Sequence, residues 1–474
     1  MQPEKDMDRK KPGALSFTSR LVLGGGVICL SPLLIVNALS HYTRGIESNP
    51  SIIGSLETNK FVAMILFLFL STVLVTVLIL RDEPSQAIPF LMTGGILILA
   101  LYLRAACINT VTPDYSSFLS PWVSHMRENG GFASLGTLQS DYNLPYLYLL
   151  ALISYLPVDD LLLIKFISIA GDFLIAYAAM ALAREMGLNY QKRLFVLTGV
   201  LFAPTIWLNS AYWAQCDVLY ALFALLCFVY ILRGRPWHAV CMAGLAFAFK
   251  LQVIFFLPML IVFLITRKLK WKHFLAFPGV YLLLCLPGLL TGRSLLSMVT
   301  IYTSQVGQYS GFLNLNSPSA YAFVSMPAGS SIGPFFTAGL AVAAVFLLYI
   351  LYWLTQREKP ISNRTLLTLA LLFCTAIPWC LPSMHERYFF MADVLVVIYA
   401  AVHPKRLYLA PMMIAASYAG YHGYLMGAYL PFPLNSMMIP SLLVATVAVL
   451  TFMDLRTQLR EDALPKKEES VVPV

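Results

Sequence analysis

Long apolar runs follow one another along most of this chain of 474 residues. A helix needs about 20 apolar residues to cross the hydrocarbon of a bilayer, and most of the runs reach or approach that length. Inside a bilayer only helices and closed barrels satisfy every backbone polar group, and the alternating pattern of barrel strands is absent. We therefore predict an all-α polytopic integral membrane protein with about fourteen transmembrane helices. The predicted spans are 21–39, 61–80, 88–106, 161–183, 194–210, 218–232, 238–249, 253–266, 274–290, 335–354, 366–381, 389–402, 407–425 and 437–452.

The charged residues orient these spans. They make up 12% of the chain, and the net charge of +9 comes from short basic clusters between apolar runs. Lys and Arg gather on the cytoplasmic side of membrane proteins, next to anionic lipid. Most of the 32 basic residues fall on one side when the N-terminus is placed inside. We therefore expect cytosolic termini, and we expect membrane lipids rather than nucleic acid as the partners of these charges.

Two long polar segments lie on the opposite, outer side. The first, 107–160, contains an apolar stretch, 144–156, that is too short to span and is typical of a helix lying in the interface or re-entering the membrane. The second outer loop is 291–333, and the charged residues 454–474 form a cytosolic tail that we expect to be disordered. No soluble stretch is long enough to stand alone, so the chain is predicted to form a single membrane-embedded domain.

The first outer loop carries the strongest candidate active site. Asp114 and Asp141 are the only aspartates of the stretch 107–148, and a tyrosine follows each of them. An ionisable group at the edge of a bilayer is costly, and it usually binds or deprotonates something. Further polar residues fall on the same predicted side, and we include them as substrate-binding candidates: Gln215, Asp217, Lys250, His385, Glu386 and Arg387.

These side chains suit glycosyl transfer from a lipid-phosphate sugar to an acceptor hydroxyl. An alcohol is a poor nucleophile until a carboxylate takes its proton, which is the role we predict for Asp114, or for Asp141 in its place. Lys250, Arg387 and His385 would stabilise the departing phosphate in a low-dielectric site. A single in-line displacement predicts inversion at the sugar carbon and needs no covalent intermediate.

Each candidate also has a structural interpretation. Asp114 suits the N-cap of a helix, Asp141 suits a turn, and residues 215–217 suit the cap of a helix that begins at 218. Lys250 divides two short apolar stretches, so it either extends to the membrane surface or faces a cavity at a helix break. Residues 385–387 suit a hydrogen-bonded turn.

No P-loop, H-E-x-x-H motif or metal-ligand spacing of His and Cys is present. We therefore expect no cofactor beyond the lipid-linked donor, and the metal requirement stays open.

Five motifs, taken in order, resemble those of the polytopic GT-C glycosyltransferases. They are D-Y-x-x-F-x-x-P-W at 114–122, D-Y-N-L-P-Y at 141–146, W-A-Q-C-D-V-L-Y at 213–220, A-F-K-L-Q-V-I-F-F-L-P at 248–258 and H-E-R-Y-F-F at 385–390. The chain is similar to the bacterial relatives of the second GPI mannosyltransferase and, more distantly, to the dolichyl-phosphate-glucose glucosyltransferases. The resemblance extends over 114–393, most of the chain.

This resemblance implies a catalytic aspartate that maps onto Asp114, with Asp141 in the second acidic motif of the same loop. It implies a polyprenyl-phosphate mannose or glucose as donor, with Lys250, His385 and Arg387 near the phosphate, and a glycan or lipid-linked acceptor outside a bacterial plasma membrane. Two other interpretations stay open: a flippase or transporter for lipid-linked glycans, and a noncatalytic scaffold of an envelope complex. Transporters place charges near the midplane in paired repeats, whereas these polar residues lie on one side.

Overall fold

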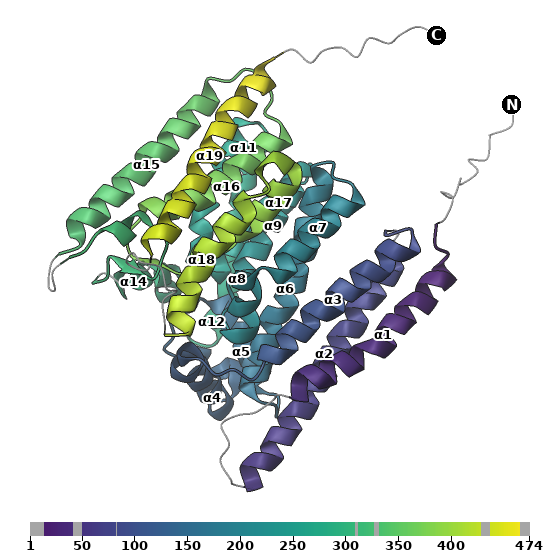
Figure 1. The fold of residues 1–474 in the computed structure, drawn as a ribbon. Coiled ribbons are helices and arrows are strands. Elements are labelled where there is room, and N and C mark those ends of the chain that lie inside the picture. The colour runs from purple at the N-terminus through teal and green to yellow at the C-terminus, as the bar shows by residue number, and fades with distance from the viewer. Residues whose placement is uncertain are drawn as a thin grey trace, which may run out of the picture. The chain divides into compact units, whose positions relative to one another are not determined.

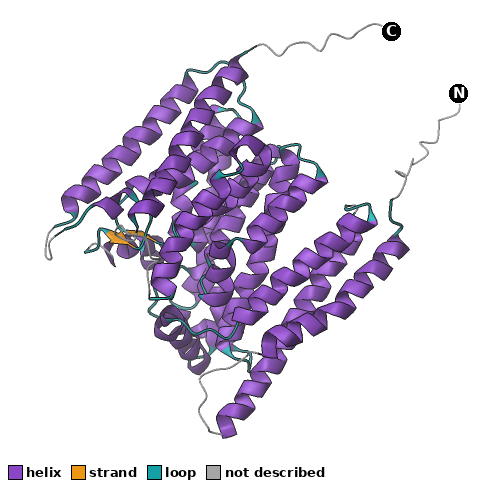
Figure 2. Ribbon diagram, viewed as in Figure 1, coloured by secondary structure: helices purple, strands orange, loops and turns teal. Residues whose placement is uncertain are grey.

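The computed structural model describes residues 14–40, 50–81, 83–308, 311–326, 331–427 and 437–464. These residues are almost entirely helical, and their only sheet has two short strands (Figure 2). Eight of the described helices are long and apolar enough to cross a membrane, or up to nine if a bent pair forms one span. The prediction of an all-α multi-pass membrane protein is confirmed. The count of about fourteen spans stays a prediction.

The chain divides into two compact units, residues 1–110 with 189–194 and residues 111–188 with 195–474. In the first unit, three helices pack against one another: α1 (Phe17–Ser40), α2 (Pro50–Leu80) and α3 (Ala87–Cys107) (Figure 1). The start of α7 (Tyr190–Phe202) belongs to this unit. It is held by a 2.7 Å hydrogen bond between the Tyr190 and Thr93 hydroxyls and by a 2.7 Å ion pair between Arg193 and Glu83.

The second unit is built around long buried helices. Among the helices long enough to span a membrane, the most buried are α6 (Asp160–Glu185) and α16 (Asn363–Cys380), whereas α12 (Ala276–Leu290) and α15 (Gly333–Thr355) expose apolar side chains, as lipid-facing helices do. The remaining helices are α4 (Ser120–Glu128), α5 (Leu144–Ser154), α8 (Pro204–Trp207), α9 (Asp217–Leu232), α10 (Pro236–Phe249), α11 (Pro258–Ile265), α13 (Leu295–Val299), α14 (Ile301–Gln308), α17 (Phe390–Val402), α18 (Leu409–Leu425) and α19 (Met438–Ala463).

Short irregular helices connect many of these elements. Two of them are π-helical, η1 (Tyr115–Leu119) and η3 (Leu208–Tyr212). The others are 3-10 turns: η2 (Gly131–Gly136), η4 (Leu251–Phe255), η5 (Trp271–Leu275), η6 (Ala320–Phe323) and η7 (Pro404–Arg406). The strands β1 (Asn314–Leu315) and β2 (Met384–His385) pair in parallel, which joins the predicted second outer loop to the segment between α16 and α17. This pairing was not predicted from the sequence.

Three of the predicted spans are short helices that stop at polar residues. Helices α9, α10 and α17 have 16, 14 and 13 residues, fewer than the ~20 that a crossing needs. Helix α9 begins at Asp217, α10 ends immediately before Lys250, and α17 begins three residues after Arg387. Non-helical backbone is tolerated at membrane depth where it lines a cavity. The three breaks meet at one cavity, as described below.

The borders of the predicted loops can be compared with the helices. Helix α3 ends at Cys107 and α6 begins at Asp160, the limits predicted for the first outer loop, and α5 within it has only 11 residues. The expectation of disorder after Asp454 is wrong for 454–463, because α19 continues to Ala463. Asp454 anchors this extension by accepting hydrogen bonds from Arg406 and Tyr399. Residues 465–474 of the predicted tail lie outside the described residues.

Candidate active site

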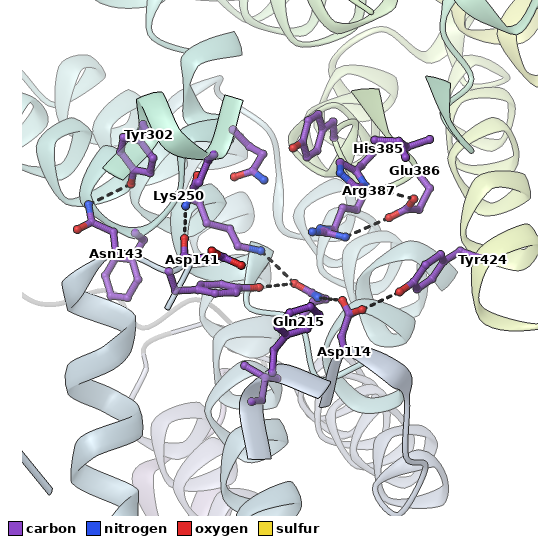
Figure 3. A pocket seen from close by; sticks show the side chains of 18 of the residues that line it. Asp114, Asp141, Asn143, Gln215, Lys250, Tyr302, His385, Glu386, Arg387 and Tyr424 are labelled. Atoms are coloured by element: carbon purple, nitrogen blue, oxygen red, sulfur yellow. Dashed lines mark hydrogen bonds and ion pairs between the residues drawn. The ribbon is translucent and has the colours of Figure 1, made fainter. Parts of the chain in front are cut away.

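A cavity of about 370 Å³ in the second unit collects most of the predicted site residues. This volume falls in the range of ordinary small-molecule sites. Seven of the eight predicted residues line it: Asp114, Asp141, Gln215, Lys250, His385, Glu386 and Arg387 (Figure 3). The eighth, Asp217, lies behind Lys250 and is completely buried. Segments far apart in the sequence therefore meet at one place.

The carboxylate of Asp114 accepts three hydrogen bonds. Trp213 Nε1 and Gln215 Nε2 donate to Oδ2 at 3.0 and 2.5 Å, and the Tyr424 hydroxyl donates to Oδ1 at 2.6 Å (Figure 3). The N-cap interpretation of Asp114 is wrong, because its side chain makes no capping hydrogen bond to η1. A carboxylate offers about four lone-pair sites, so one acceptor position of Asp114 is still available to a ligand.

Irregular backbone on two sides brings these groups together. Asp114 immediately precedes the π-helical turn η1, and Trp213 immediately follows the π-helical turn η3. Single π-helical turns occur frequently at functional sites. Ala214, between the two donors to Asp114 Oδ2, has a φ of 71°, a left-handed conformation that is rare for a residue with a β-carbon. This conformation lets the side chains of Trp213 and Gln215 reach the same carboxylate oxygen.

Lys250 supplies one of two cations in the cavity. It has extended backbone (φ −152°) between α10 and η4, so the helix breaks at this residue. Its ammonium donates to Asp217 Oδ1 at 2.6 Å and to Gln215 Oε1 at 3.1 Å, and it lies 5.1 Å from the centre of the Tyr142 ring. An ammonium has three N–H donors. Lys250 therefore faces the cavity, with one donor left for a ligand.

Arg387 supplies the second cation. Its guanidinium donates to Glu386 Oε1 at 3.1 Å, lies 3.7 Å from Asp217 Oδ2, and stacks 5.1 Å from the Trp213 ring centre. Burial alone would lower the pKa of Arg387, but the charges of Glu386 and Asp217 raise it well above its usual value. Arg387 therefore stays charged. His385, on β2, lies 3.7 Å from Glu386 Oε2.

Asp217 neutralises both cations from behind. Its carboxylate pairs with Lys250 and Arg387 and accepts a 2.7 Å hydrogen bond from Asn209 Nδ2. The cap interpretation of residues 215–217 is wrong, because no side chain caps the start of α9. Without Asp217, two cations would sit in a largely buried setting with one fewer counter-charge, which is strongly unfavourable. Asp217 is therefore placed to keep the cationic wall charged and fixed.

Asp141 has different surroundings from Asp114. Its side chain is exposed where it lines the cavity, and no described residue donates a hydrogen bond to its carboxylate. Its main-chain carbonyl accepts a hydrogen bond from Gln305 Nε2 on α14 of the second outer loop. The two acids thus differ in preorganisation, because only Asp114 is held by neighbouring donors. Within the described part of the chain, no group of three or more His, Cys, Asp or Glu side chains is placed to hold a metal ion.

Several residues of the cavity were not predicted. Tyr424 contacts the base candidate directly, and Tyr142 donates a 2.8 Å hydrogen bond to Gln215 Oε1. Burial raises the pKa of Tyr142 well above its usual value, so its hydroxyl stays a donor. One signal was available for Tyr424: Ser417, Tyr421 and Tyr424 share one face of the apolar helix α18 at helical spacing. Trp213 lies within a recognised motif but was given no role.

Comparison with known protein families assigns the chain to a class of enzyme. The sequence pattern described as "Glycosyltransferase family 87" matches residues 142–381, about half of the chain. The chain belongs to glycosyltransferase family 87. No curated protein matches the chain. The prediction of a membrane-embedded glycosyltransferase is confirmed, and the flippase alternative is not favoured.

The family 87 match covers only part of the cavity. It includes Gln215, Asp217 and Lys250, but it begins after Asp114 and ends before His385. The roles of the individual residues, and the resemblance to the second GPI mannosyltransferase in particular, therefore stay predictions.

Proposed function

We propose that this family 87 glycosyltransferase transfers a hexose, mannose or glucose, from a polyprenyl-phosphate carrier to a hydroxyl group of a glycan or lipid-linked acceptor, with inversion. The observation that carries the proposal is the carboxamide of Gln215. It donates to Asp114 at 2.5 Å and accepts from Lys250 at 3.1 Å. A proton acceptor and a cation that can bind phosphate are thereby both held by one carboxamide, which fixes their positions before a substrate binds.

The reaction needs one bond to form and one to break. Asp114 takes the proton of the acceptor hydroxyl, whose oxygen forms a bond to the anomeric carbon of the hexose. The bond between that carbon and the phosphate oxygen breaks, and polyprenyl phosphate leaves with the electron pair. Lys250 and Arg387 stabilise the charge that develops on this oxygen. Attack opposite to the leaving group inverts the anomeric carbon.

The remaining site residues have supporting roles in this proposal. Asp217 and Glu386 fix the two cations, and His385 lies beside Glu386 at the phosphate side of the cavity. Asp141, which is exposed and not held by donors, binds a substrate hydroxyl in place of acting as the base. No cofactor beyond the lipid-linked donor takes part.

The same proposal includes a location. Both termini are proposed to lie in the cytosol and the cavity on the extracytosolic face of a bacterial plasma membrane, which the distribution of the basic clusters supports. A polyprenyl-phosphate donor is anchored in the membrane, and its sugar reaches this face without a soluble nucleotide. The enzyme would then act on components of the cell envelope.

The Asp114→Asn variant tests the proposal. Purified enzyme is incubated with short-chain polyprenyl-phosphate mannose or glucose and a bacterial lipid extract as the source of acceptor, and the consumption of donor is followed. Asparagine keeps the shape of the side chain but cannot take a proton, so transfer should fall by about 10²- to 10⁴-fold. Asp141→Asn serves as the matched control and should retain measurable transfer. Unchanged transfer by a folded Asp114→Asn enzyme, or equal losses in both variants, would contradict the assignment of Asp114 as the base.

A further inference from the structure

The carboxamide of Gln252 lines the cavity but contributes nothing to its internal hydrogen bonding. Its Oε1 atom is buried and accepts no hydrogen bond from any described residue. Buried carbonyl oxygens are nearly always paired, with protein, water or ligand. Leaving one unpaired is destabilising, so a group that donates a hydrogen bond is expected to fill this position when the site is occupied.

Other carboxamides of the same cavity differ from Gln252 in this respect. Asn143 donates to the hydroxyls of Tyr281 and Tyr302 and accepts from its neighbour's main-chain N–H. Gln215 uses both ends to join Asp114 and Lys250. These two side chains therefore use their hydrogen bonds to stabilise the folded structure of the site. Among the described residues, no hydrogen bond engages the side chain of Gln252, which leaves both of its ends for a ligand.

The hydrogen-bonding chemistry of the unpaired Gln252 carboxamide determines which group of a ligand can bind to it. A carbonyl oxygen only accepts hydrogen bonds, so it repels the oxygens of a phosphate diester and attracts O–H or N–H donors. If the two ends of the carboxamide are exchanged, its N–H2 group takes the buried position, and the ligand group must accept a hydrogen bond instead. A carboxamide that both donates and accepts matches a hydroxyl group, which can do both as well.

The position of Gln252 places that hydroxyl close to the donor phosphate. Gln252 lies in the turn η4, which begins directly after the break at Lys250. One short segment thus presents a cation and, two residues later, an uncharged carboxamide to the same cavity. In a sugar phosphate, the hydroxyls of the ring lie next to the phosphate group in the same way.

We propose that Gln252 binds a ring hydroxyl of the donor hexose and thereby determines which hexose is transferred. This inference rests on the proposed function, because it assumes a polyprenyl-phosphate hexose as donor.

The experiment compares donors that differ by one hydroxyl. Full-length wild-type enzyme, Gln252→Leu and the control Gln356→Leu are each given short-chain polyprenyl-phosphate mannose and glucose. They are then given the monodeoxy analogues of the hexose that wild type prefers. Gln356 is exposed at the end of α15 and does not line this cavity. Wild type and Gln356→Leu should lose about tenfold or more in kcat/KM with one particular deoxy donor.

The leucine variant at 252 should transfer the parent hexose as slowly as wild type transfers that deoxy analogue, and it should no longer distinguish the two. If Gln252→Leu fails to fold, Gln252→Asn is used instead. Its side chain is one methylene group shorter, so the carboxamide no longer reaches the same position, and we expect the same result. Undiminished discrimination across the whole panel in either folded variant overturns the inference. A wild-type enzyme that transfers neither hexose overturns the proposed function, and this inference with it.

Discussion

Asp114 and Asp141 line the same cavity, but their chemically identical side chains have different surroundings. Donors on three sides fix the Asp114 carboxylate, whereas the Asp141 carboxylate is exposed and receives no hydrogen bond from a described residue. A base acts efficiently when its orientation is set before the substrate arrives. The surroundings therefore distinguish two acids that the sequence alone left as alternatives.

Tyr424 offers a direct test of this preorganisation. Its hydroxyl donates to Asp114 Oδ1 at 2.6 Å, and its ring stacks on Trp213 with 4.8 Å between the ring centres. Tyr424→Phe keeps the stacking and removes the hydrogen bond. We expect kcat to fall by about tenfold, the equivalent of one hydrogen bond to a charged group, while the KM for the donor stays unchanged. Steady-state kinetics with short-chain donors measures both parameters. A variant with wild-type kcat would show that Tyr424 does not orient the base.

Asp217 provides a test of the buried charges. Asp217→Asn leaves Lys250 without its closest anion, and breaking a buried pair from one side costs about 3–5 kcal/mol. We expect a lower unfolding temperature in detergent. The double variant Asp217→Asn with Lys250→Met removes both charges, so it should recover much of the lost stability while transfer stays abolished. A double variant no more stable than the single one would mean that the pair contributes through something other than charge balance.

At the scale of the elements, the site is made of interruptions in helices. The polar groups at 215–217, 250 and 385–387 were predicted from the sequence because each interrupts an apolar run, and an interruption is visible as a change in composition. Tyr424 lies inside an apolar helix, where its helical spacing with Ser417 and Tyr421 marks a shared face but does not show whether that face meets a cavity or lipid. The left-handed Ala214 has no sequence signal at all, because glycine is the residue expected in that conformation.

Close packing of α18 brings Tyr424 to the site. A β-carbon added at Gly420 would lie 2.5 Å from the Asn316 carbonyl oxygen and 2.9 Å from Glu386 Cβ. Only glycine therefore lets α18 approach both the second outer loop and the segment that carries Arg387.

Gly420→Ala should push these elements apart, with a loss of about 1–3 kcal/mol in stability and a reduced rate of transfer. The matched control is Gly279→Ala in α12, where an added β-carbon meets nothing within 4 Å. An alanine there should be neutral or should stabilise the helix by about 0.5–1 kcal/mol. Thermal unfolding and transfer assays on both variants make the comparison. Equal behaviour of the two alanine variants would contradict the proposed close contact.

For the whole molecule, hydropathy predicted the class of protein, which is confirmed, whereas the number of its spans stays a prediction. Eight described helices pass a strict test of length and composition, whereas the sequence suggested about fourteen crossings. Much of the difference between the two numbers comes from helices such as α10 and α17, which are short because one end of each stops near the cavity. Because an apolar run of 13 to 16 residues occurs both in short spans and in buried helices, its length alone cannot decide between them.

The orientation of the molecule can be tested with single cysteines. Glu128 at the end of α4 and Glu358 after α15 are both exposed, and the predicted orientation has them on opposite sides of the membrane. In intact cells, a membrane-impermeant maleimide should label Glu128→Cys above the level of the parent chain, whose own free cysteines, with Cys29 exposed, give the background. Glu358→Cys should react only after the cells are permeabilised. The reverse pattern would put the cavity in the cytosol, where soluble nucleotide sugars are available and a lipid-linked donor is no longer required.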